Sequence, residues 1–125
     1  MAIDLFIEGI PYGQWKARGK KEAAAVWSDV VKLATSNLPK LVGPCSVSVS
    51  FVLPLDKFPT DHPYGPDLDN LVKRLFDALN ETIFTEMPGK DGAVIELSAC
   101  KHAAKPDEPP GIRLVIKEKP RRLRK

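Results

Sequence analysis

Apolar residues recur at helical spacing in the stretch PDLDNLVKRLFDALNETIF, between Pro66 and Phe84. The positions that share one helix face are Leu68, Leu71, Val72, Leu75, Phe76 and Leu79. Because spacings of three and four residues place side chains on one side of an α-helix, this stretch is predicted to be a helix that packs by that face. Asp67 directly precedes the periodic run, so it is predicted to cap the helix by accepting backbone N–H groups.

A second helix is predicted between Glu22 and Leu38, where Pro39 ends the pattern. Alternation of apolar and polar residues predicts strands near residues 3–7, 45–53, 93–100 and 112–117. The resulting order β-α-β-α-β-β favours an α+β (or α/β) fold, in which two helices pack against a mixed sheet of about four strands. The proline-rich connection over residues 54–66 is long enough to predict a functional loop.

The chain length of 125 residues fits one domain, predicted over residues 1–118. Residues 119–125 are predicted to form a flexible basic tail, and they account for the whole excess of basic residues, since the remaining residues are slightly acidic in sum. No apolar run has the length of a membrane span, and the start MAIDLFIEGI is too short and too acidic for a secretory signal, so we expect a cytoplasmic protein. Cys45 and Cys100 lack metal-ligand spacing and are predicted to be buried free thiols.

Two acidic residues flank the start of the central helix. Asp67 and Asp69 would diverge by about 200° if both were helical, so they converge on one ligand only if Asp67 lies in the non-helical entry. Two neighbouring carboxylates repel each other unless a cation neutralises them. Lys73 follows Asp69 by four residues, on the same side of the helix. The simpler interpretation is a capped helix with one ion pair.

A third acid, Asp91, directly precedes a predicted strand. This arrangement predicts that Asp67, Asp69 and Asp91 meet at one edge of the sheet. Three carboxylates suit Mg²⁺, which prefers oxygen ligands. A metal at such a site can activate water for phosphoryl chemistry, while Lys73 stabilises developing negative charge.

The block DLDNLVKRLFDAL at positions 67–79, followed by a turn with Asp91, resembles the RusA family of Holliday-junction resolvases, which are common in bacteriophages and prophages. The resemblance implies a homodimeric, Mg²⁺-dependent endonuclease that cuts two opposed strands of a four-way DNA junction in recombination and repair. It also implies that Asp67, Asp69 and Asp91 bind the metal and that Lys73 is a catalytic lysine. The resemblance covers the element order over most of the chain, with its specific motifs between Asp67 and about Lys101.

The sequence departs from the family pattern at three places. Lys90 stands where family members often have a second acid, the approach TDHPYGP lacks the usual arginines, and the turn TEMPGK lacks the usual aromatic and acidic run. These departures keep two alternatives open: a binding protein for branched DNA without catalysis, and a nuclease for flaps or forks. A third alternative is an interaction protein whose charged segments serve assembly.

A basic segment follows the first predicted strand and combines aromatic with positively charged side chains. We expect it to contact DNA phosphates through Lys16, Arg18, Lys20 and Lys21. The alternative is that Trp15 packs at the edge of the core and the cations are solvated.

Overall fold

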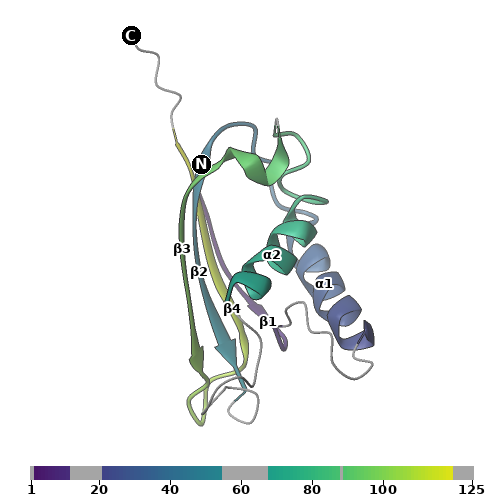
Figure 1. The fold of residues 1–125 in the computed structure, drawn as a ribbon, viewed down its shortest axis with the longest axis vertical. Helices are drawn as coiled ribbons and strands as arrows, with labels where there is room; N and C mark the ends of the chain where they lie inside the picture. The colour runs from purple at the N-terminus through teal and green to yellow at the C-terminus, as the bar shows by residue number, and fades with distance from the viewer. Residues whose placement is uncertain (1, 12–20, 55–67, 88, 120–125) are drawn as a thin grey trace.

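The computed structural model describes residues 2–11, 21–54, 68–87 and 89–119 (Figure 1). Its elements are β1 (Ala2–Glu8), α1 (Lys21–Thr35), β2 (Cys45–Leu53), α2 (Leu68–Leu79), the short 3₁₀ helix η2 (Lys90–Ala93), β3 (Val94–Ala103) and β4 (Gly111–Glu118). The predicted order of strands and helices is confirmed, and the fold is of the α+β class. In the described parts of the chain, no helix is long and apolar enough to cross a membrane.

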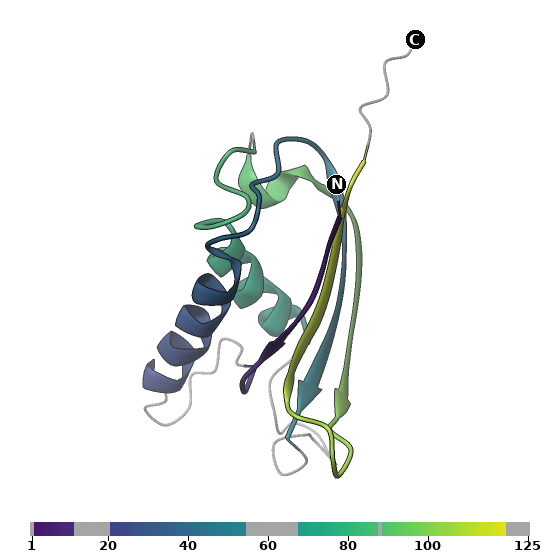
Figure 2. The same cartoon turned by 180° about the vertical axis from the view of Figure 1, so that it is seen from behind.

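The four strands form one mixed sheet in the order β1-β4-β2-β3. β4 pairs antiparallel with both β1 and β2, whereas β2 and β3 are parallel. Both helices lie on the same face of this sheet, as the two opposite views show (Figures 1 and 2). Since parallel neighbours need a crossover connection, α2 carries the chain from the end of β2 back to the start of β3.

The core lies between the sheet and the two helices. The alternation in β2 buries Val47, Val49 and Phe51, and the stripe of α2 buries Leu71 and Leu75 against them. From α1, Trp27 and Val31 complete the same cluster. The periodicities of the sequence therefore identified the buried face of each element, because one face of each element is removed from water.

The two cysteines are both free thiols, as predicted, but only Cys45 is buried. The prediction that Cys100 is buried was wrong. Cys100 lies on β3 at the edge of the sheet, beside the Ser50 hydroxyl at 3.3 Å, on the face opposite the helices. Alternation alone marks two faces of a strand, and it does not say whether either face is covered.

Candidate active site

The start of α2 presents two of the predicted site residues to solvent. The helix begins at Leu68, directly after Asp67, where the sequence predicted its start. Asp69 lies in the first turn, Lys73 lies one turn later, and both side chains are exposed. An α-helix places residues four apart on the same side, so the carboxylate and the ammonium share one surface of α2. Asp67 itself lies outside the described residues.

The other end of α2 holds Asp91 through Asn80, the residue that follows the helix. The Asn80 Nδ2 group donates a hydrogen bond to Asp91 Oδ2 at 3.2 Å. The backbone N–H of Asp91 donates in turn to Asn80 Oδ1 at 3.0 Å. One side-chain amide therefore fixes both the backbone and the carboxylate of Asp91, which is half-buried.

Asn80 was not among the residues that the sequence singled out. The available signal was its place directly after the last apolar position of the helix, where asparagine often ends a helix. That position predicts a cap, and only the tertiary structure shows that the side chain holds Asp91 eleven residues later.

The segment between Asn80 and Asp91 is anchored in the core. Ile83, Phe84 and Met87 are buried, and the Phe84 ring meets Phe76 of α2 edge to face, with centroids 6.1 Å apart. The backbone N–H of Leu41 donates to the Ile83 carbonyl at 3.0 Å, which ties the segment to the approach to β2. Burial of large apolar side chains therefore determines where this turn lies.

Polar contacts join the same segment to α1. The hydroxyls of Thr35 and Thr82 form a buried hydrogen bond of 2.8 Å, and Lys40 Nζ donates to the Thr82 carbonyl at 3.1 Å. Lys32 and Glu81 add an ion pair of 3.1 Å. Buried hydroxyls that lack a partner are costly, so the threonine pair requires the end of α1 and the turn to stay together.

Two left-handed residues redirect the chain just before Asp91. Gly89 has a φ of 74° and Lys90 a φ of 51°. The Lys90 N–H donates to the Met87 carbonyl at 2.9 Å, and Lys90 begins η2, which has Asp91 in its first turn. A left-handed conformation costs a residue with a Cβ about 1 kcal/mol, so Lys90 introduces local strain next to the carboxylate. Its side chain is exposed.

Asp69 and Asp91 lie at opposite ends of α2. From position 69 to position 80 the helix rises by about 16 Å, at 1.5 Å per residue. Asp69 therefore lies at the end of the sheet where strand β2 finishes. Asp91 lies at the opposite end, where strand β3 starts. Within one chain these two carboxylates therefore lie at opposite ends of α2, and the predicted meeting of all three acids, which includes Asp67 outside the described residues, stays a prediction. The separation arises because the parallel pairing of β2 and β3 makes α2 cross the full height of the sheet.

No group of three His, Cys, Asp or Glu side chains close enough to hold a metal ion is present among the residues that the structure describes. Lys21 is the first residue of α1, whereas Lys16, Arg18 and Lys20 lie outside the described ranges. The proposed contacts of these four residues with DNA therefore stay predictions.

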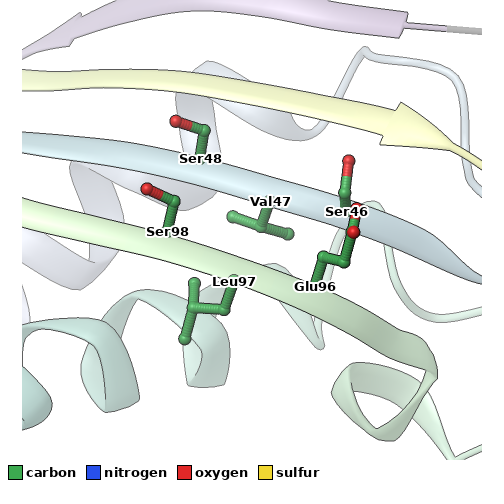
Figure 3. A pocket seen from close by; sticks show the side chains of 6 residues that line it. All are labelled: Ser46, Val47, Ser48, Glu96, Leu97 and Ser98. Atoms are coloured by element: carbon green, nitrogen blue, oxygen red, sulfur yellow. The ribbon is translucent and has the colours of Figure 1, made fainter.

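A shallow depression lies between β2 and β3, near the start of both strands. It is lined by Ser46, Val47, Ser48, Glu96, Leu97 and Ser98 (Figure 3). Its one carboxylate, Glu96, is exposed and forms an ion pair with Lys119 at 3.2 Å. Glu96 therefore lies at the surface as one partner of an ion pair.

Comparison with known families finds a match over most of the chain. The sequence model of the family described as Endodeoxyribonuclease RusA matches residues 12–117, a range that contains α2 and both of its ends. No curated protein matches the sequence significantly.

Proposed function

The chain belongs to the RusA family of endodeoxyribonucleases, and we propose from this premise that it is a homodimer that resolves four-way DNA junctions by paired, symmetric, Mg²⁺-dependent nicks. Family membership makes it a Holliday-junction-resolving endonuclease in general. The metal, the pairing of the cuts, the dimer and a cytoplasmic location are our proposal.

The acidic side chains fit a hard cation. Mg²⁺ prefers carboxylate oxygens, and Asp67, Asp69 and Asp91 would provide them. The hydrogen bond from Asn80 to one oxygen of Asp91 supports this assignment, because ligating carboxylates are commonly oriented by such partners. When bound, the ion supplies activation of water and neutralisation of phosphate charge.

The other polar residues have roles that follow from their positions. The exposed Lys73 ammonium, one turn beyond Asp69, stabilises negative charge on the phosphate oxygens as the bond breaks. Asn80 keeps the Asp91 carboxylate in one orientation. Lys16, Arg18, Lys20 and Lys21 bind the phosphate backbone without reading sequence, so the enzyme recognises the shape of the junction.

We infer that each active site takes residues from two chains. Asp69 and Asp91 lie too far apart in one chain to share an ion, which supports a site built from Asp67 and Asp69 of one subunit and Asp91 of the other. A two-fold dimer then carries two such sites, in keeping with the symmetry of a four-way junction.

The first experiment replaces Asp69 by Asn and measures cleavage of labelled four-way junctions in Mg²⁺. We expect cleavage to fall by at least about 100-fold, with junction binding retained because the basic residues are unchanged. Asp77→Asn is the matched control, since Asp77 is an exposed aspartate of the same helix. Undiminished cutting by Asp69→Asn would end the catalytic assignment.

The second experiment mixes the Asp69→Asn variant protein with the Asp91→Asn variant protein and measures nicking of four-way junctions. If the sites are shared between chains, a mixed dimer has one intact site, so two inactive proteins regain nicking activity together. The control mixes Asp69→Asn with Lys73→Ala, which lie on the same end of α2 and leave no intact site in either arrangement. Failure of the first mixture, in conditions where subunits exchange, would place each site within one chain.

The alternatives are separated by substrate and by metal. Cleavage rates measured on flaps, forks and four-way junctions would show whether the junction is the preferred substrate. A thermal unfolding temperature that does not change at millimolar Mg²⁺, together with binding but no cutting of branched DNA, would favour a non-catalytic binding protein.

A further inference from the structure

Strand β3 carries a lysine on the face of the sheet on which the helices lie. Lys101 is the register partner of Phe51 on β2, and the Phe51 side chain is fully buried in the core. Partners in register point to the same face of a sheet, so Lys101 also faces the helices. The residues before it on this face of β3 are uncharged: Ile95, Leu97 and Ala99. The row therefore changes from apolar to charged at Lys101.

Lys101 lies toward the end of the sheet where α2 begins. Strands β2 and β3 are parallel, and their last residues, Leu53 and Ala103, are paired. In both views the first turn of α2 is directed toward the arrowheads of these two strands (Figures 1 and 2). Lys101 comes shortly before the end of β3, so it lies toward the same end of the molecule as Asp69 in the first turn of α2.

The Lys101 side chain is half-buried, whereas Lys73 on α2 is exposed. The aliphatic part of a lysine side chain can cover apolar surface while its ammonium group stays in water. A side chain held in this way has fewer rotamers to lose when its ammonium group binds an anion. Lys101 is therefore better placed than Lys73 to hold an anion in one position.

An ammonium group from β3 and one from α2 lie toward the same end of the sheet. Like charges that lie near each other repel, and an anion that binds both relieves this repulsion. Lysine binds phosphate groups as a point charge, without demanding a particular geometry. A DNA strand carries a phosphate at every nucleotide, so successive phosphates can bind Lys73 and Lys101 together.

We propose that Lys101 binds a DNA phosphate next to the one that Lys73 contacts, and so positions the strand across the start of α2. Lys73 acts on the phosphate whose bond breaks, whereas Lys101 contributes mainly to affinity and alignment. This assignment rests on the proposed function, because it places a second lysine at the same site. The simpler alternative is that the Lys101 side chain only covers the apolar surface beside Phe51.

The principal test compares Lys101→Met with Lys101→Arg. Methionine keeps an unbranched side chain that covers Phe51 but removes the charge, whereas arginine keeps the charge. Binding of labelled four-way junctions is measured by fluorescence anisotropy over a range of salt concentrations, with EDTA in place of Mg²⁺ so that no strand is cut. Loss of one phosphate contact should weaken binding by roughly 5- to 10-fold and reduce the slope of log K against log salt by about 0.9. Lys101→Arg should retain both the affinity and the slope.

The matched control is Lys117→Met. Lys117 is an exposed lysine of β4, and its partner on β2 is Ser46, on the face of the sheet away from the helices. This variant should bind junctions with the affinity and the slope of the wild type. Thermal unfolding followed by circular dichroism checks that each variant is folded. A wild-type slope in Lys101→Met, or a loss of affinity that Lys101→Arg does not restore, overturns the proposed contact.

Cleavage kinetics in Mg²⁺ separate the two lysines. Lys101→Met should raise the KM for the junction more than it lowers kcat, because the contact holds DNA before and during the reaction. Lys73→Ala should mainly lower kcat, since its interaction strengthens as the bond breaks. A fall in kcat alone for Lys101→Met would overturn its role in positioning.

The two proposals fail separately. A protein that cuts no branched DNA, but whose junction affinity and salt slope depend on the charge at position 101, supports the contact and overturns the proposed function. An active resolvase whose junction affinity is unchanged by Lys101→Met supports the function and overturns the contact.

Discussion

The two ends of helix α2 each present an acidic side chain, but by different means. At the start, Asp69 and Lys73 are exposed, and their relation follows from helix geometry alone. At the end, Asp91 lies eleven residues beyond Asn80 and is held by hydrogen bonds and by a turn with three buried apolar residues. The first arrangement depends on local structure and the second on the whole fold.

This difference indicates how each end responds to mutation. Changes at the start of α2 should alter chemistry with little effect on stability, because the side chains face solvent. Changes at the end should affect stability and chemistry together, since the residues that position Asp91 are also part of the core.

The largest effect is expected for Phe84→Ala. Removal of a fully buried ring that packs on Phe76 should lower the free energy of unfolding by about 3–5 kcal/mol. Urea denaturation monitored by circular dichroism gives this value. Leu33→Ala, at an exposed position, should change it by less than about 0.5 kcal/mol. A small loss for Phe84→Ala would show that the turn is not held by its core contacts.

A smaller effect on stability is expected for Asn80→Ala, with a clear effect on activity. The variant leaves the N–H and the carboxylate of Asp91 without this partner and should lower the free energy of unfolding by about 1–2 kcal/mol. Junction cleavage should fall about tenfold and require more Mg²⁺. Asn37→Ala, at an exposed asparagine, should change neither quantity. If Asn80→Ala needs no more Mg²⁺ than the wild type, Asn80 contributes to stability only and does not orient Asp91 for metal binding.

Lys90→Gly should stabilise the protein by about 1 kcal/mol or less, because glycine adopts the left-handed conformation without strain. Chemical denaturation measures the gain. Lys105 is an exposed lysine without a positive φ, so Lys105→Gly should give no gain and serves as the control. A loss of stability in Lys90→Gly would mean that the left-handed turn before Asp91 costs less than its geometry implies.

The smallest effect is one of reactivity. Cys45, on strand β2, lies opposite Val94 at the start of β3, next to η2. Burial raises the pKa of the Cys45 thiol, and the negative charge of Glu118 raises it further. A raised pKa in the folded state means that stability falls as pH rises above the ordinary thiol value of about 8.5. At pH 8 a thiol reagent should label Cys100 of the folded wild type and reach Cys45 only on unfolding, as mass spectrometry can show. Rapid labelling of Cys45 in the folded protein would show that this edge opens readily.

Much of the fold could be predicted from the sequence, because periodicity follows from local geometry. The stripe of α2 and the alternation in β2 each mark a face that must be buried, so the elements, their order and much of the core were identifiable. The shared surface of Asp69 and Lys73 was predictable for the same reason, since it needs only a helix. The exposure of Cys100 was not, because it depends on which strand lies at the edge of the sheet.

The sequence by itself determined the elements, their buried faces and the acidic start of α2, all of which depend on residues close together along the chain. The tertiary structure decided the strand order, the parallel pairing of β2 and β3, and with it the place of Asp91 beside Asn80. The direction in which two strands pair is chosen by the packing of the whole core. For that reason no local pattern could show that Asp69 and Asp91 are separated by the length of a helix.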